Sequence, residues 1–259
     1  MDLAALLRLP PQGLELFLLL LTRFSGIFML APVFGNAVVP IRFRVGLAVL
    51  TAALIYPSAV AWPVPAMEGP LDVAFVMAAE LAIGATLGFV ANCLFFGIQL
   101  AGHMIALQMG LGMSMMFDPN TRTQTTELAV LFVLLATVTF LALDGHHWLL
   151  LAVWKSFQAV PLGGFALTGG IMEQVLLATT GIFDVALTLM LPVLGVLMLA
   201  ELALAIMSRI MPQMNVFVAG FPVKIVLGLA TLAATLPLLG GYMRFVIDRL
   251  GPGLTGFFR

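Results

Sequence analysis

Long apolar runs, separated by short turns that contain proline, glycine or polar residues, dominate this chain of 259 residues. An α-helix rises about 1.5 Å per residue, so roughly 20 apolar residues are enough to cross the ~30 Å hydrocarbon core of a bilayer. The pattern predicts an all-α, polytopic protein with six helical units. Their expected positions are about residues 13–31, 45–61, 71–117, 127–143, 171–211 and 223–247.

Two of these runs, 71–117 and 171–211, each hold more than 40 residues, about twice the length that a perpendicular span needs. Each is therefore expected to form either two passes or one long broken helix. The connections are too short to hold a separate soluble domain, and no repeat of fixed period is present. The sequence therefore predicts one domain, residues 1–259.

The composition supports a membrane protein, because 62% of the residues are hydrophobic and only 9% are charged. Soluble domains carry about 25% charged residues. The formal net charge of -1 gives no electrostatic basis for binding nucleic acid. Cys93 is the only cysteine, which excludes an intrachain disulfide and a CxxC metal or redox motif.

Motifs that indicate an enzyme, a cofactor or a metal are absent from the sequence. It has no GxSxG motif, no phosphate-binding P-loop and no dinucleotide fingerprint. The stretch DGHHW at Asp144–Trp148 has two adjacent histidines, which we expect to point in different directions from a turn. Without a third ligand at helical spacing, this stretch does not predict a metal site. We expect no catalytic residues, no cofactor and no metal.

Five ionisable residues lie inside apolar runs, where each costs several kcal/mol unless it is paired or hydrated. They are Glu15, Arg23, Glu80, Asp184 and Glu201. Glu15 and Arg23 are about two helical turns apart, too far for a direct pair, so each is expected to meet a partner on another helix. Two interpretations stay open: pairing at helix ends or subunit interfaces, and a proton or ion relay.

Small residues recur at helical spacing through the third run. They are Gly84 with Gly88, Gly97 with Ala101, and the series Ala106, Gly110 and Ser114. Such ladders allow two helix backbones to approach closely. The pattern fits packing within the chain as well as packing against partner subunits.

The stretch ALQMGLGMSMMFDPN, residues 106–120, combines two glycines, several methionines and a phenylalanine ahead of Asp118 and Pro119. Glycine loosens a helix, methionine adapts its shape, and proline disfavours helix at the residue before it. The stretch predicts an irregular apolar loop, which at membrane depth must be buried in protein or line a cavity. A compliant hydrophobic constriction and an ordinary methionine-rich helix end are the two interpretations.

Four motifs resemble the FliR family, which comprises a flagellar export-gate protein and its injectisome counterparts in type III secretion. They are RFSGIFMLAPVFGNAVVPIRFRVGLA at 23–48, AGHMIALQMGLGMSMMFDP at 101–119, FLALDGHHWLL at 140–150 and SRIMPQMNVFVAGFPVKIVLGL at 208–229. They occur in family order and extend over nearly the whole chain. The last motif is the most specific.

The resemblance implies a fold and a set of partners. Residues 1–170 would resemble a FliP-like subunit, and residues 171–259 a FliQ-like helical hairpin. One copy would join several FliP-like and FliQ-like subunits at the flagellar basal body in the bacterial inner membrane. FlhB-like and FlhA-like export proteins would be further partners, and unfolded flagellar subunits would be the cargo.

The resemblance also implies roles for individual residues. A plug that helps close the channel would contain Gly110, Gly112, Met113, Met115, Met116 and Phe117, and would end at Asp118. The turn between the last two helices, on the cytoplasmic side, would contain Pro212, Gln213, Asn215, Phe217, Pro222 and Lys224. Subunit interfaces would use these turn residues, and the small-residue pattern adds Gly84, Gly88, Gly97, Ala101 and Ala106 as further interface candidates.

The resulting hypothesis is a non-enzymatic component of the flagellar protein export gate. The alternative is a secondary transporter for a small solute that uses Glu80, Asp184 and Glu201 as coupling acids. That alternative would require paired broken helices in two related halves, and the sequence has no such internal symmetry.

Overall fold

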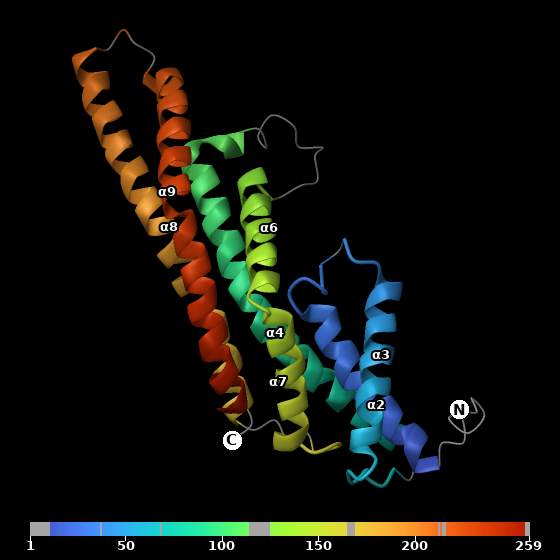
Figure 1. Ribbon diagram of the computed structural model, residues 1–259. Coiled ribbons are helices and arrows are strands. Elements are labelled where there is room, and N and C mark those ends of the chain that lie inside the picture. Colours follow the sequence, from blue (N-terminus) through green and yellow to red (C-terminus); the bar gives the residue numbers. More distant parts are fainter. Residues whose placement is uncertain are drawn as a thin grey trace. The chain divides into compact units, whose positions relative to one another are not determined.

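The computed structural model describes residues 11–36, 38–67, 69–113, 125–164, 169–211, 213 and 216–256. Their regular structure is helical, with a short 3-10 helix, η1, after α4 (Figure 1). The helices are α2 (Pro11–Leu30), α3 (Ile41–Ala59), α4 (Pro70–Met109), η1 (Leu111–Met113), α6 (Glu127–Ala142), α7 (Gly145–Ala159), α8 (Gly169–Ile210) and α9 (Val216–Gly256). The predicted all-α class is confirmed.

Five of these helices, α2, α3, α4, α8 and α9, are long and apolar enough to cross a membrane. The pair α6 and α7 adds a sixth candidate if the two helices form one span. The run at 171–211 forms the single helix α8, with 42 residues, and the run at 71–117 forms the single helix α4, with 40 residues, as far as Met109. Within Pro70–Met109 and Gly169–Ile210 the expected break is absent, although α8 contains Pro192.

Helix α7 was missing from the six predicted units because its sequence, GHHWLLLAVWKSFQA, is less apolar than the other spans. Its buried positions nevertheless follow helical spacing, since Leu149, Val153, Ser156 and Phe157 are all less than 9% exposed. Asp144 separates α7 from α6 with a φ of 56°, a left-handed conformation that aspartate tolerates better than most residues. The turn expected at residues 144–148 is therefore confined to the junction at Asp144, because α7 already begins at Gly145.

The chain divides into two compact units. The first contains residues 1–92, 146–178 and 249–259, and the second contains residues 93–145 and 179–248. Helices α4, α8 and α9 each contribute residues to both units, and the expected single domain over residues 1–259 stays a prediction.

In the first unit, α2 crosses α4 at very short distance, because glycines of α4 face the backbone of α2. A Cβ atom at Gly84 would overlap the carbonyl oxygen of Arg23, and one at Gly88 would lie 2.8 Å from the carbonyl oxygen of Ile27. Side chains of this unit complete the core, with the Phe24 and Phe157 ring centroids 6.0 Å apart. The two helix backbones can approach this closely because glycine has no side chain.

In the second unit, the C-terminal part of α4 packs against α6 and α8 by the same means. A Cβ atom at Gly97 would lie 2.7 Å from the carbonyl oxygen of Ile182 in α8, and one at Gly102 would lie 2.8 Å from Cα of Ala129 in α6. Ala101 and Ala106 are fully buried. The small residues of α4 therefore bring three helices together.

The outer helix faces remain strongly apolar. Only 11% of the α3 span and 17% of each of the α8 and α9 spans are buried within the chain. Their exposed residues include Leu54, Leu199 and Val226, each at least 66% exposed. Apolar faces of this extent require lipid or other protein to cover them.

Candidate functional site

Helix α4 ends at Met109, inside the methionine- and glycine-rich stretch that the sequence analysis singled out. Gly110 adopts a φ of 85°, and its N–H group donates to the Leu107 carbonyl oxygen at 3.0 Å. Glycine reaches this left-handed conformation without steric cost, so it ends the helix. The chain continues through η1, which includes Gly112 and Met113. The predicted departure from regular α-helix is confirmed for these described residues.

The remainder of the predicted plug lies outside the described residues. This applies to Met115, Met116, Phe117 and Asp118, and to Ser114 of the small-residue series. The described part of the candidate site is therefore the end of α4 and its contacts.

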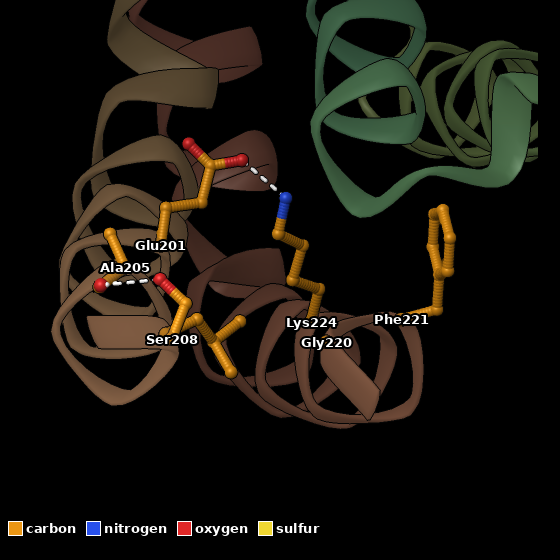
Figure 2. Close-up of a pocket in the computed structure, with 7 residues that line it drawn as sticks. Glu201, Ala205, Ser208, Gly220, Phe221 and Lys224 are labelled. Carbon is orange, nitrogen blue, oxygen red and sulfur yellow. Dashed lines mark hydrogen bonds and ion pairs between the residues drawn. The ribbon is translucent and has the colours of Figure 1, made fainter. Parts of the chain in front are cut away.

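A polar cluster holds the last turn of α4 to the α8–α9 hairpin, which consists of α8 and α9. The Glu201 carboxylate in α8 accepts a hydrogen bond from Gln108 Nε2 at 3.1 Å on one oxygen, and pairs with Lys224 Nζ of α9 through the other. Figure 2 shows the Glu201 and Lys224 side chains pointing toward each other. The Glu201 side chain is 43% exposed and that of Lys224 21%.

Two apolar contacts flank this cluster. A Cβ atom at Gly228 in α9 would lie 2.7 Å from Cγ of Met109, so the Met109 side chain rests directly on the α9 backbone. A Cβ atom at Gly110 would collide with the ring of Phe221, also in α9. Three consecutive residues, Gln108 to Gly110, therefore contact the hairpin.

A cavity of about 230 Å³ opens beside the polar cluster, between α8 and α9 (Figure 2). It is lined by Glu201, Leu204, Ala205, Ser208, Gly220, Phe221 and Lys224. Water can reach the ion pair through it, as the partial exposure of both side chains indicates.

A second polar cluster lies in the first unit, around the fully buried side chains of Arg23 and Glu80. Arg23 Nε in α2 donates to the Glu80 carboxylate in α4 at 2.5 Å, and both side chains are 0% exposed. The other guanidinium nitrogens bond the Val160 carbonyl oxygen at 3.2 Å, and Arg23 Nη1 lies 3.3 Å from Ser156 Oγ. The guanidinium carbon also stacks 4.2 Å above the Phe157 ring centroid.

The Glu80 carboxylate has both oxygens engaged. One oxygen accepts a hydrogen bond from Arg23 Nε, and the other accepts one from the backbone N–H of Gly163 at 2.9 Å. A buried charge needs such complete pairing, because burial removes the water that would otherwise solvate it. The arrangement joins α2, α4 and the turn after α7 and suits a structural role.

The expectation that Arg23 meets a partner on another helix is confirmed. The ion pair of Glu201 also joins two helices. Asp184 differs from both, because it is exposed on the face of α8. Glu15 is partly exposed beside a cavity of about 400 Å³ that Tyr56 and Trp62 also line.

The residues expected at subunit interfaces fall into two groups. Those on α4, namely Gly84, Gly88, Gly97, Ala101 and Ala106, pack inside their own unit of this chain. Of the two interpretations left open for the ladder, packing within the chain is thus the one that the contacts of these residues show.

The second group was assigned to the turn between the last two helices. Gln213 lies in that turn and is exposed, whereas Pro212 and Asn215 lie outside the described residues. Phe217, Pro222 and Lys224 belong to α9, which begins at Val216. The predicted turn was therefore too long, because α9 begins seven residues before the apolar run that predicted it.

The expectation for the two adjacent histidines was wrong. The rings of His146 and His147 lie with centroids 4.2 Å apart at an interplanar angle of 36°. Contact between flat aromatic rings at such distances is favourable. The two imidazole rings therefore lie against each other at the start of α7.

Residues 14–250 match the model of a protein family described as bacterial export proteins, family 1. The match extends over most of the chain, including both polar clusters. The chain belongs to this family.

Curated relatives of this export family carry the name flagellar biosynthetic protein FliR. The protein of Escherichia coli strain K12 is 31% identical over 92% of this chain and 90% of its own length. That of Bacillus subtilis strain 168 is 33% identical over 81% of each chain, and that of Pectobacterium carotovorum is 32% identical over 84% of this chain and 82% of its own. The resemblance to the FliR family is confirmed.

Proposed function

We propose that this chain is a component of the flagellar type III protein export gate in the bacterial inner membrane, at the flagellar basal body. The observation that carries the proposal is the family match over residues 14–250, together with the FliR proteins at 31–33% identity over most of their length. The long apolar helices are consistent with a membrane location.

In this proposal, one copy of the chain joins FliP-like and FliQ-like subunits around a channel for unfolded flagellar proteins. FlhB-like and FlhA-like export proteins are its further partners. The sparsely buried faces of α3, α8 and α9 support an assembly, because other subunits would cover apolar surface that the chain leaves open. Residues 1–170 are the FliP-like part and residues 171–259 the FliQ-like hairpin.

The same proposal assigns the segment from Gly110 to Asp118 to a plug that helps close the channel. It is supported by the end of α4 at Met109 and by the positive φ of Gly110, which mark a departure from regular α-helix at the start of this segment. The role is mechanical and not enzymatic, with energy supplied by other parts of the apparatus.

The contacts of Glu80 argue against the rival function of a small-solute transporter. A coupling carboxylate must exchange its proton or ion with the transported solution during each cycle. Glu80 is fully buried and holds Arg23 and Gly163, so releasing it would break the packing of the first unit.

The composition of the purified complex tests the proposal. A tagged copy is co-expressed with its neighbouring membrane genes, extracted in mild detergent and weighed by native mass spectrometry. We expect one copy of this chain with several copies of two smaller hydrophobic proteins. A monomer or homodimer, under conditions that keep a reference membrane complex intact, would contradict the gate.

The plug is tested by replacing Met115, Met116 and Phe117 together with alanine. Removing their bulk from a hydrophobic constriction should admit water and ions, so we expect membranes leaky to ions with the complex still assembled. The matched control is Met198→Ala on an exposed face of α8. Equal ion flux in both variants would show that these residues do not close the channel.

A further inference from the structure

The end of α4 is attached to the α8–α9 hairpin by three neighbouring residues with three different kinds of contact. Gln108 makes a hydrogen bond to Glu201, Met109 packs on the backbone at Gly228, and Gly110 lies under the ring of Phe221. All of these residues belong to the second unit. Together they determine the direction in which the chain leaves α4.

Glu201 is the only one of these partners that contacts both α4 and α9 from α8. One carboxylate oxygen holds Gln108 and the other holds Lys224. Lys224 therefore balances the charge of the carboxylate, while Gln108 holds the end of α4 to it. A movement of α8 against α9 that displaces Glu201 would strain or break this hydrogen bond to the last turn of α4.

We propose that Glu201 is a positioning residue for the export gate: it fixes the exit of the chain from α4 at Gly110, and its bond to Gln108 must open during passage of a substrate. The inference rests on the proposed function. The inference adds Glu201, which lies outside the plug, to the residues that hold the closed state. It also assigns control of the end of α4 to the α8–α9 hairpin.

The accessibility of the cluster makes such a release feasible. Water can replace Gln108 on the carboxylate, because Glu201 is 43% exposed beside a cavity. The net free energy of a hydrogen bond that exchanges with water is small, which suits a contact that opens and closes repeatedly. The buried Arg23–Glu80 pair lacks this access.

The first experiment removes the anchor and keeps the ion pair. Gln108→Leu should raise ion leak about tenfold, the factor that corresponds to losing one hydrogen bond to a charged group. The matched control is Gln99→Leu, which removes the same amide from a partly buried position earlier on α4 and should leave the leak unchanged. Equal leak in the two variants would overturn the proposal.

A charge exchange tests the role of Glu201 itself. Glu201→Lys places two ammonium groups together and should leak, whereas Glu201→Lys with Lys224→Glu restores the pair. The Gln108 amide can then accept from the lysine at 201 through its oxygen, so the double variant should return to within about twofold of the wild-type leak. A double variant that assembles and still leaks like the single one would contradict the positioning role.

A reversible cross-link between α4 and α9 tests whether the end of α4 must move away from the hairpin when that bond opens. A Cβ atom at Gly228 would lie 2.7 Å from Cγ of Met109, which is compatible with a disulfide between cysteines at the two positions. In a Cys93→Ser background, Met109→Cys with Gly228→Cys should support export when reduced and lose it when oxidised. Undiminished export with the disulfide fully formed would overturn the requirement for opening.

Native mass spectrometry of every variant separates this inference from the proposed function. Wild-type complexes that lack the smaller subunits would refute the gate itself. Correctly assembled complexes whose ion leak is unchanged by Gln108→Leu and Glu201→Lys would refute only the positioning role.

Discussion

Two ion pairs among the described residues, Arg23–Glu80 and Glu201–Lys224, have the same basic chemistry and opposite surroundings. The side chains of Arg23 and Glu80 in the first unit are fully buried and contact four further protein groups between them. Glu201 and Lys224 in the second unit are partly open and reach the end of α4 through a single amide. The difference indicates that one pair fixes the packing of helices, whereas the other can be rearranged without unfolding them.

The energetic consequence of breaking each pair follows from its exposure. Removing one partner of a buried pair leaves an uncompensated charge, which costs about 3–5 kcal/mol. Exposed pairs contribute about 0–1 kcal/mol, because water replaces the lost partner. Removing one charge from the buried pair should therefore lower the free energy of unfolding far more than removing one charge from the exposed pair.

The largest expected effect is that of Glu80→Leu. It leaves the Arg23 guanidinium buried without its carboxylate and should lower the free energy of unfolding by about 3–5 kcal/mol. Thermal unfolding of the purified protein in mild detergent measures the change. Adding Arg23→Met should recover much of the loss, because an apolar pair of similar volume replaces the ions. A loss no larger than that of Lys224→Met would remove the contrast between the two clusters.

A smaller but clear effect is expected for Gly84→Leu. Its side chain would collide with the Arg23 carbonyl oxygen and push α2 from α4, which costs about 1–3 kcal/mol for overpacking and disturbs the Arg23 cluster from the backbone side. Gly46→Leu on α3 is the control, because a Cβ atom there meets no atom within 4 Å. Similar thermal midpoints for the two variants would show that the helix crossing is not a determinant of stability.

The smallest effect on stability is expected for Lys224→Met. Its partner Glu201 is 43% exposed and can be solvated, so the free energy of unfolding should fall by about 0–1 kcal/mol. Urea titration of the purified protein in detergent, read beside Glu80→Leu, measures the difference. A loss above ~3 kcal/mol would place this pair in the structural class and weaken its proposed role in positioning.

Hydrophobic run length predicted most of the helices, because this property is local and strong in a membrane protein. It failed at α7, where His146, Lys155 and Gln158 dilute the apolar character although one face is buried. The paired glycines of the 106–120 stretch correctly predicted where regular helix ends, since the conformation of Gly110 depends on its own lack of a side chain.

The polar clusters could be predicted only in part. Sequence identified Arg23, Glu80 and Glu201 as charges that need partners, but the identity of each partner depends on which helices cross. Ser156 and Val160 are more than 130 positions from Arg23, and Gln108 is 93 positions from Glu201. No spacing rule connects such positions, and α7, which carries Ser156, was not among the predicted helices.

The reach of the Arg23 cluster along the chain has a consequence for biosynthesis. Arg23 emerges 57 residues before Glu80 and 133 residues before Ser156. At synthesis rates of about 5–20 residues per second, the guanidinium of α2 spends several seconds without its carboxylate. The first span therefore has to be kept near water, lipid headgroups or an insertion factor until α4 arrives, and the first unit matures only after α7 has been made.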